Sequence, residues 1–248
     1  MRKPRIYSEQ QLQVDCSIDL SERVANHVGH VLRMKPGESL VLFNGQGGAW
    51  MARIENVNKR SIIVYIESYI EGDAQSPLTI ELGQTLSRGE RMDYVIQKAT
   101  EVGVTSITPL WSERCEVKLN AERQDKRVKH WQQLAISACE QCGRNIVPTI
   151  HAPVKLENWL SSRATELNFV LHHRTHEKLN GFEQPESVSL LIGPEGGLTS
   201  QEIKLAESHH FNPLVLGPRI LRTETAPIVA VSLMQYLWNE SKWSLCTD

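Results

Sequence analysis

The sequence contains no long hydrophobic run, which argues against a chain that crosses a membrane. Its 248 residues include no apolar stretch that approaches the length of about eighteen residues that a membrane span needs. No apolar segment follows the basic start at residues 1–5, so no secretory signal pattern is visible. We therefore expect a cytoplasmic protein.

Cysteine is scarce, and the few cysteines are not spaced as in a disulfide framework. There are five of them, an odd number, and only Cys139 and Cys142 stand close together. Their C-x-x-C spacing would need a second pair of ligands at suitable spacing to hold zinc, and the sequence offers none. The histidines at positions 172, 173 and 176 are interpreted as the end of a solvated strand. We therefore expect no metal site.

The chain also lacks an excess of positive charge and the common glycine motif for phosphates. Its net charge is −2, so any binding of nucleic acid would depend on local basic patches. No G-x-x-x-x-G-K-[ST] sequence is present, which excludes a P-loop, and there is no G-x-S-x-G nucleophile elbow. A basic group at Arg123, Lys126, Arg127 and Lys129 is interpreted as a solvated helix face, with nucleic-acid binding as the alternative.

Two sections of different pattern indicate two domains. Residues 39–70 alternate short apolar strands with tight turns after a helical segment at 21–31, which is typical of a small β-barrel. Residues 71–77 resemble a linker. From there on, strands alternate with helices, which predicts an α/β domain with a parallel sheet covered by helices. We expect the two domains to be 1–72 and 73–248.

The elements of the second section have clear limits in the sequence. The expected strands are 78–82, 106–110, 167–171, 188–192 and 214–216, and the expected helices are 90–102, 121–142, a helix opened by the capping box of Thr199 and Glu202, and 227–238. The last of these helices is apolar on nearly every side. It is therefore either a central core helix or a helix that a second subunit covers on one face.

Two loops rich in glycine and proline are the most informative feature of the chain. The first is residues 193–199, directly after an apolar strand, and the second is residues 216–227, after the next one. Glycine lets the backbone adopt positive φ and come close to a ligand. In open α/β sheets, ligands bind beyond the carboxyl ends of the strands. The two loops are therefore predicted to be two walls of one pocket, although each alone could be an ordinary strand–turn–helix connection.

These loops resemble the signature loops of the RsmE family, bacterial ribosomal RNA uridine N3-methyltransferases of the SPOUT (α/β-knot) superfamily. Residues 191–198 read Leu-Ile-Gly-Pro-Glu-Gly-Gly-Leu, and residues 216–226 read Leu-Gly-Pro-Arg-Ile-Leu-Arg-Thr-Glu-Thr-Ala. The segment 98–103 resembles the family's K-x-x-E-L-G, with Val102 in place of leucine, and residues 140–144 resemble its E-Q-[small]-G-R. The resemblance covers essentially the whole chain.

The resemblance implies a fold, a cofactor and partners. The fold is a trefoil-knotted parallel-sheet methyltransferase domain at 73–248 preceded by a PUA-like β-barrel that binds RNA at 1–72. The activity is methylation by S-adenosyl-L-methionine of N3 of a specific uridine in 16S ribosomal RNA, within the small ribosomal subunit, by a homodimer. The residues implied for the cofactor are Leu171, His172, Gly193, Pro194, Glu195, Gly196, Gly197, Leu216, Gly217, Ile220, Leu221, Thr223, Thr225 and Ala226; those for RNA are Arg5, Arg33, Lys35, Lys98, Gln141 and Arg144.

The chemistry of such a reaction needs a proton acceptor and a donor to developing negative charge. N3 of uridine is a nucleophile only after it loses its imide proton, and the resulting charge spreads onto the carbonyl oxygens. Arg222 is the candidate cationic donor, and Glu101 or Glu224 is the candidate to take the proton or to orient Arg222. The alternatives are a loop-stiffening salt bridge between Arg222 and Glu224, and a surface position at a helix end for Glu101.

Two other functions fit the same sequence. One is ribose 2′-O-methylation of RNA by a relative in the superfamily, but such relatives carry an S-L-N-V-type motif where this chain has Leu221 to Thr225. The other is an RNA-binding ribosome assembly factor without catalytic activity. Both glycine loops and Arg222 are intact, which favours an enzyme.

Overall fold

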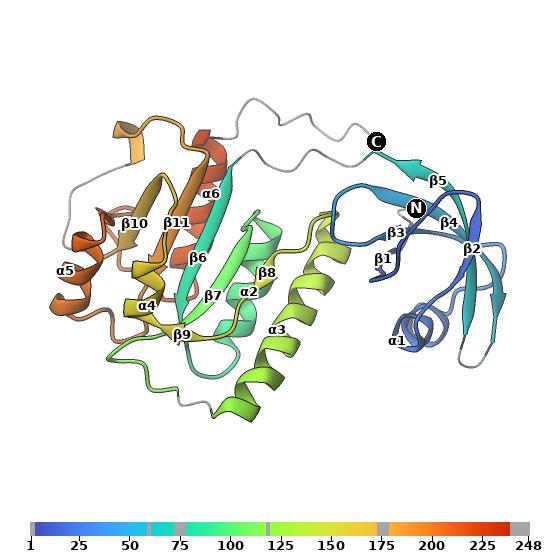
Figure 1. Cartoon of the computed structure of the whole chain (residues 1–248), viewed down its shortest axis with the longest axis horizontal. Helices are drawn as coiled ribbons and strands as arrows, with labels where there is room; N and C mark the ends of the chain where they lie inside the picture. Colours follow the sequence, from blue (N-terminus) through green and yellow to red (C-terminus); the bar gives the residue numbers. More distant parts are fainter. Residues whose placement is uncertain (1–2, 59–60, 72–77, 118–119, 173–178, 239–248) are drawn as a thin grey trace. The chain divides into compact units, whose positions relative to one another are not determined.

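The chain folds into two compact units (Figure 1). The computed structural model describes residues 3–58, 61–71, 78–117, 120–172 and 179–238. One unit comprises the chain up to residue 75 together with residues 136–147, and the other comprises the remainder. Most of the linker expected at 71–77 lies outside the described residues.

The first unit is built on a sheet in the order β1-β3-β4-β5-β2. The strands are β1 (Arg5–Tyr7), β2 (Cys16–Asp19), β3 (Ser39–Phe43), β4 (Ala49–Val57) and β5 (Ile62–Ile70). β1 pairs with β3 in parallel, and the other pairs are antiparallel. The β structure predicted over 39–70 is confirmed. β1 and β2 were not predicted, because strands of three and four residues carry too little periodicity.

Alternation along the strands places the core of this unit. In β5, Ile62, Val64 and Ile66 are buried while the residues between them are partly exposed. The helical segment predicted at 21–31 is present as α1 (Glu22–Asn26), which continues into one π-helical turn, η1 (His27–Val31), and Val28 of this turn is fully buried against the sheet.

The end of helix α3 (Ala121–Cys142) also belongs to the first unit. Cys139 packs in one buried cluster with Val41, Phe43 and Ala49 of the sheet. Nearby, the backbone N–H of Tyr7 donates a 3.0 Å hydrogen bond to the carboxylate of Glu140. Residues 136–147 are thus packed against β1 and β3 although they follow far later in the chain.

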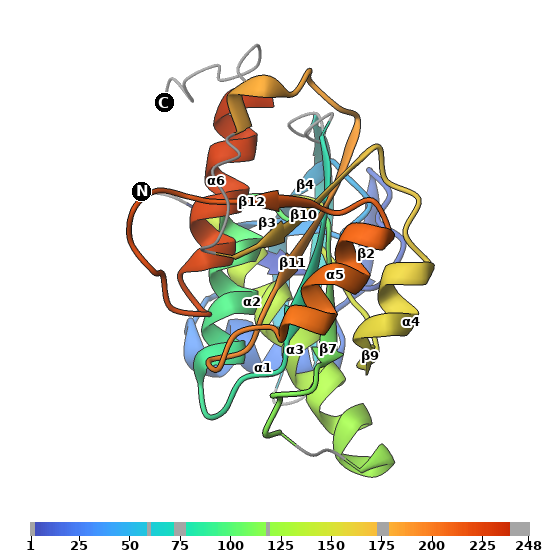
Figure 2. The same cartoon turned by 90° about the vertical axis from the view of Figure 1, so that its left-hand side faces the viewer.

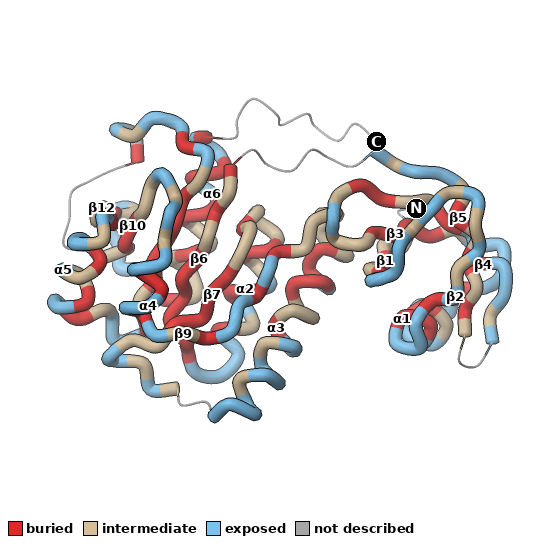
Figure 3. The backbone as a smooth tube through the Cα atoms, viewed as in Figure 1, coloured by how far each residue is buried: buried red, intermediate tan, exposed pale blue. Residues whose placement is uncertain are grey.

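The second unit is an α/β fold with a parallel sheet in the order β12-β10-β11-β6-β7-β8, and β9 pairs with β7. The strands are β6 (Thr79–Thr85), β7 (Ser106–Trp111), β8 (Thr149–Ile150), β9 (Val154–Lys155), β10 (Leu167–Leu171), β11 (Ser187–Ile192) and β12 (Asn212–Leu214). Strands buried on both faces need near-continuous apolar runs, and β11 is buried from Val188 to Ile192 (Figure 3). The predicted parallel sheet is confirmed.

Helices cover both faces of this sheet (Figure 2). α2 (Arg91–Glu101) and α6 (Ala226–Trp238) lie on one face, and α4 (Leu156–Ser161) and α5 (Ser200–Ser208) lie on the other, with the 3₁₀ turn η2 (Leu179–Gly181) between β10 and β11. The predicted capping box is confirmed at the start of α5, where Thr199 and Glu202 exchange side-chain-to-backbone hydrogen bonds. No helix among the residues that the structure describes has the length and apolarity to cross a membrane.

Candidate functional site

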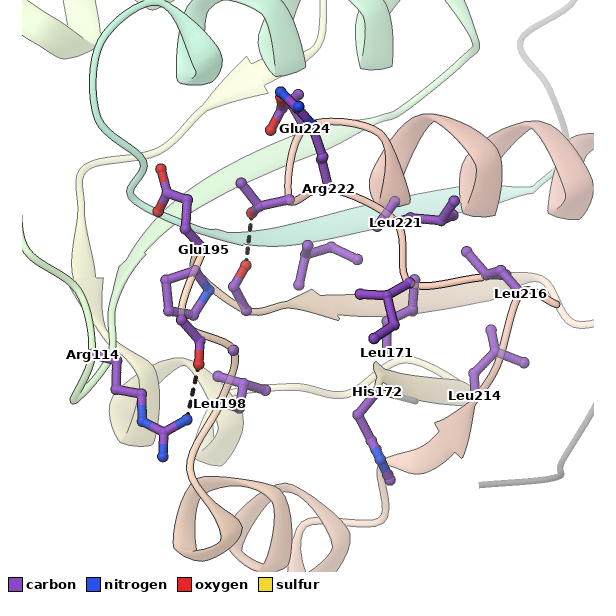
Figure 4. Close-up of a pocket in the computed structure, with 18 of the residues that line it drawn as sticks. Arg114, Leu171, His172, Glu195, Leu198, Leu214, Leu216, Leu221, Arg222 and Glu224 are labelled. Atoms are coloured by element: carbon purple, nitrogen blue, oxygen red, sulfur yellow. Dashed lines mark hydrogen bonds and ion pairs between the residues drawn. The ribbon is translucent and has the colours of Figure 1, made fainter. Parts of the chain in front are cut away.

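Three neighbouring strands of the parallel sheet end at one cavity. β10 ends at Leu171, β11 at Ile192 and β12 at Leu214, and these strands are adjacent in the sheet. All three terminal residues line a cavity of about 620 Å³ (Figure 4). That volume lies within the range of sites for small molecules and cofactors. The position, beyond the carboxyl ends of parallel strands, is where open α/β sheets bind ligands.

The first glycine loop connects β11 to α5 and forms one wall of the cavity. The N–H of Gly197 donates a 2.8 Å hydrogen bond to the carbonyl of Pro194, which closes a tight turn. Gly197 has φ +68°, a left-handed backbone conformation that residues with a Cβ rarely adopt. The loop then enters α5 through the capping box at Thr199. The sequence of this loop is therefore determined by its turn and by the helix start.

The second glycine loop is bonded to the first through a buried threonine. The hydroxyl of Thr223 donates a 2.7 Å hydrogen bond to the carbonyl oxygen of Gly193, and the side-chain amide of Gln84 donates to the Thr223 hydroxyl at 3.1 Å. Gln84 is fully buried near the end of β6. Close to this network, the hydroxyl of Thr85 donates to the carbonyl oxygen of Ile192. The two loops and the end of β6 therefore form one hydrogen-bonded structure.

Charged side chains from three segments meet at the rim of the cavity. Arg91, the first residue of α2, lies 2.5 Å from the Glu195 carboxylate of the first loop. Its Nε lies 3.9 Å from the Glu224 carboxylate of the second loop, and the Arg222 guanidinium lies 4.0 Å from the same carboxylate. The Glu224 side chain is 17% exposed and that of Arg222 is 81% exposed, and the two lie together in Figure 4. A largely buried carboxylate thus stands between two guanidinium groups.

The ionisation of Glu195 reflects this arrangement. Partial burial alone would raise the pKa of its carboxyl group. Hydrogen bonds from the backbone N–H of Glu195, from the Arg91 side chain and from the backbone N–H of Arg88 outweigh burial and lower that pKa below its ordinary value. The first loop therefore presents a carboxylate that is held ionised.

Most residues predicted for the cofactor site line this single cavity. Those that do are Leu171, His172, Gly193, Pro194, Glu195, Gly196, Gly197, Leu216, Ile220, Leu221, Thr223 and Ala226. Gly217 and Thr225 lie in the second loop but are not among the lining residues. The N–H of Thr225 instead donates to the carbonyl of Arg222 at 2.9 Å, in the turn that starts α6.

The three candidate catalytic residues are not all brought together. Arg222 and Glu224 line the cavity, whereas Glu101 does not. Glu101 is the last residue of α2 and pairs with Lys98 at 2.8 Å, while Arg91 at the opposite end of that helix lines the cavity. Ten residues of helix separate the two ends by about 15 Å. Of the two carboxylates predicted for catalysis, Glu224 lines the cavity of the single chain and Glu101 does not.

Two arginines that line the site were not predicted from the sequence. Arg91 and Arg114 both line the cavity, and the Arg114 side chain donates a 2.8 Å hydrogen bond to the carbonyl of Gly196 (Figure 4). They follow β6 and β7, whose carboxyl ends lie at the same edge of the sheet as the glycine loops. Their position at this edge of the sheet could have indicated that they line the site, but the two connections carry no glycine-rich motif. Further lining residues that were not predicted are Ile192, Leu198, Ile203, Leu214, Val215 and Arg219.

The residues predicted to contact RNA lie in both units. Arg33, Lys35 and Gln141 are exposed in the first unit, and Arg33, two residues after the π-helical turn, has φ +54°. Lys98 is partly buried in the second unit, in its pair with Glu101.

The other two predicted RNA contacts are packed within the first unit. The Arg5 guanidinium lies 5.2 Å from the centre of the Phe43 ring and hydrogen-bonds to Asn145. Burial lowers the pKa of the Arg144 guanidinium, and the neighbouring Cys139 and Cys142 raise it by less. Both guanidinium groups therefore contact neighbouring residues of the first unit and also carry a positive charge.

Among the residues that the structure describes, no group of three or more histidine, cysteine, aspartate or glutamate side chains is placed to hold a metal ion. His173 and His176 of the histidine segment lie outside those residues.

Comparisons with known protein families and relatives agree with the fold and the site. Residues 74–235 match the RNA methyltransferase domain family, and residues 20–67 match the RNA methyltransferase PUA domain family. The fold and the cavity thus define an RNA methyltransferase with an N-terminal PUA domain. Two relatives from Buchnera aphidicola, each named ribosomal RNA small subunit methyltransferase E, are 35% and 38% identical over 96% and 94% of this chain, and 95% and 96% of their own lengths. The chain belongs to the ribosomal RNA small subunit methyltransferase E family.

Solved structures lead to the same family. A methyltransferase from Legionella pneumophila in complex with the cofactor SAM is 44% identical, with a TM-score of 0.93, and the match covers 96% of this chain and 98% of that one. The ribosomal RNA small subunit methyltransferase E from Neisseria gonorrhoeae, bound to S-adenosyl methionine, is 40% identical, with a TM-score of 0.91, covering 97% and 100%. The family resemblance drawn from the two glycine loops is confirmed.

Proposed function

We propose that this chain transfers the methyl group of S-adenosylmethionine to N3 of a uridine in 16S ribosomal RNA in the cytoplasm. The observation that carries the proposal is one cavity walled by both glycine loops, with Arg222 and Glu224 at its rim. The names of the relatives indicate small-subunit ribosomal RNA as the substrate. The two similar structures with bound S-adenosylmethionine indicate the cofactor.

The lining of the cavity fits S-adenosylmethionine. Leu171, Leu216 and Leu221 give it apolar walls suited to an adenine ring, while the two glycine loops offer backbone groups suited to its polar edges. When bound, this cofactor supplies an electrophilic methyl group on a positively charged sulfur. The protein then has to exclude water, align the nucleophile and accommodate the charge that develops on it.

Arg222 is the residue that we assign to the negative charge on the uracil. Loss of the N3 proton spreads charge onto two carbonyl oxygens, and a guanidinium offers several donors in a rigid fork. Glu224 lies 4.0 Å from Arg222 and is held on its other side by Arg91, so it can orient Arg222 or accept the proton. Because Glu101 lies at the far end of α2, Glu224 is the better placed of the two carboxylates.

We further propose that the active species is a homodimer and that α6 contributes to its interface. Leu233, Tyr236 and Leu237 of this helix are 37%, 60% and 36% exposed in the single chain. Apolar side chains grouped on one exposed helix face suggest a protein partner. The trefoil knot of the domain 73–248 and an RNA-binding role for the domain 1–72, with contacts from exposed Arg33 and Lys35, belong to the same proposal.

The test is methylation of RNA by the purified protein. The protein is incubated with S-adenosylmethionine and small ribosomal subunits from a strain without this methyltransferase, or with naked 16S RNA, and the nucleosides are then separated by mass spectrometry. We expect 3-methyluridine. Formation of 2′-O-methylated nucleoside would contradict base methylation, and RNA binding without any methylated product would identify an assembly factor instead.

A further inference from the structure

The first half of α3 carries a surface of positive charge that the proposed reaction does not use. Arg123, Lys126, Arg127 and His130 together line a shallow depression, which we call the α3 basic patch. None of these four residues lines the cavity of the glycine loops. The first turns of α3 are mostly exposed, as the pale blue segments at its start in Figure 3 show.

The spacing of the four side chains places them on one face of the helix. Positions 123 and 127, and positions 126 and 130, are four residues apart, so each pair shares a face. The helix start is fixed by Asn120, whose side-chain oxygen accepts a 2.9 Å hydrogen bond from the backbone N–H of Arg123. Arg123 therefore lies in the first turn of α3, at the positive end of the helix dipole.

The depression is anchored to the rest of the second unit through Asp93 of α2. One carboxylate oxygen of Asp93 lies 2.8 Å from the His130 ring, and the other accepts a 2.9 Å hydrogen bond from the Trp131 indole. Trp131 is buried. This side of the patch is thus tied to α2 through both oxygens of one carboxylate.

Two guanidinium groups of the patch remain available to an external anion. Lys126 pairs with Glu122 at 2.6 Å, and His130 pairs with Asp93. Arg123 and Arg127 are exposed and form no salt bridge with any residue that the structure describes. A solvated helix face usually balances its cations with acids one turn away. Here the acid one turn before Lys129 is Asp125, whereas Arg127 is preceded one turn earlier by Arg123.

We propose that the α3 basic patch binds phosphate groups of the RNA backbone. Arginine matches phosphate because its fork of donors can form two parallel hydrogen bonds to one phosphate. In a chain of net charge −2, a cationic face of this kind would direct a polyanion to one side of the molecule. The inference rests on the proposed function for the identity of the ligand as RNA. It adds a contact surface in the methyltransferase unit, apart from the PUA domain.

The test compares matched charge removals on one helix. Arg127→Gln removes a charge inside the patch, and Lys129→Gln removes a charge two residues away and outside it. Binding of a 16S RNA fragment is measured over a range of salt concentrations for the wild type, both single variants and Arg123→Gln/Arg127→Gln. The slope of log affinity against log salt should fall by about 1 for Arg127→Gln and by about 2 for the double variant. Lys129→Gln should keep the wild-type slope.

Controls separate this inference from the proposed function. Affinity for S-adenosylmethionine should be unchanged in every variant, since none of these residues lines the cavity. Equal salt slopes for Arg127→Gln, Lys129→Gln and the wild type would overturn the inference, even if the wild type forms 3-methyluridine. If polyglutamate binds the wild type and loses affinity in the double variant while RNA affinity does not change, the patch would be assigned to an acidic protein instead. A wild type that binds RNA with the expected slopes but methylates nothing would overturn only the proposed function.

Discussion

The hydroxyl of Thr223 donates a 2.7 Å hydrogen bond to the carbonyl oxygen of Gly193, 30 positions earlier in the chain. This bond joins the two glycine loops at a buried point, and the side-chain amide of Gln84 in β6 donates a further hydrogen bond to the Thr223 hydroxyl. Each loop would otherwise depend on its own turn for its position. The shape of the cavity is therefore a property of both loops together.

Thr223→Val should weaken the site without changing its volume much. The valine keeps the shape but leaves the Gly193 carbonyl and the Gln84 amide without this partner, which costs about 1–3 kcal/mol for buried polar groups. We expect a lower free energy of unfolding in urea and roughly tenfold weaker binding of S-adenosylmethionine, equivalent to about 1.4 kcal/mol. Thr223→Ser keeps the hydroxyl and should bind nearly as the wild type does. Wild-type affinity in Thr223→Val would show that the bond does not shape the site.

Gly197→Val should abolish cofactor binding while the protein stays folded. Position 197 has φ +68° and lines the cavity, so a β-branched residue is strained there and fills part of the cavity. The matched control is Gly37→Val, where φ is +89° and no atom lies within 4 Å of the added Cβ. Both variants should lose some stability, but only Gly197→Val should lose affinity in calorimetric titration. Equal affinities in the two variants would place the cofactor elsewhere.

Glu195 should contribute to stability in a pH-dependent way. Its pKa in the folded protein lies below the ordinary value of 4.5, so the folded state favours the carboxylate. The stabilisation is therefore present above pH 4.5 and is lost as the pH falls through the lower folded-state pKa. Urea unfolding of Glu195→Gln should show a deficit against the wild type at neutral pH that shrinks in acid. The exposed Glu157→Gln is the control. A deficit that stays constant with pH would contradict the role of the Arg91 contact.

Tyr236→Glu should separate the proposed dimer. The side chain is 60% exposed in the single chain, so a charge there need not unfold the protein but would have to be buried in an interface on α6. We expect the wild type to sediment as a dimer at micromolar concentration and the variant to sediment as a monomer. Leu32→Glu, at a position 38% exposed in the first unit, should remain a dimer. A monomeric wild type would refute this part of the proposal.

Hydrophobic periodicity and helix capping predicted many of the helices and strands, and strand pairing and other tertiary contacts determined the remaining elements. β10 has the predicted bounds, 167–171, and α3 has the predicted bounds, 121–142. β12 was expected at 214–216 but forms at Asn212–Leu214, where its three residues pair with residues 169–171 of β10. α4 is a helix of only six residues and was not predicted. Short elements depend on tertiary contacts that a local pattern does not contain.

The same limit applies to the site. Both glycine loops could be found because their composition is unusual, and the structure brings them to one cavity. Arg91 and Arg114 come from ordinary connections and reach the cavity only because β6 and β7 end at the same edge of the sheet. Glu101 was selected by motif, and the helix carries it away from the cavity. Sequence motifs identified the two glycine loops, whereas the order of the strands in the sheet determined which other residues lie beside them.

In the proposed reaction, Arg222 stabilises the negative charge on the uracil while the two glycine loops hold the cofactor. The measurement is the single-turnover rate of 3-methyluridine formation in Arg222→Ala, at saturating S-adenosylmethionine and RNA. The control is Arg219→Ala, which removes another exposed arginine from the lining of the same cavity. We predict a loss on the order of a hundredfold to a thousandfold for Arg222→Ala, with little change in cofactor affinity and only partial recovery in Arg222→Lys. A rate equal to that of the wild type would show that Arg222 does not stabilise this charge and would leave Arg222 as a structural partner of Glu224.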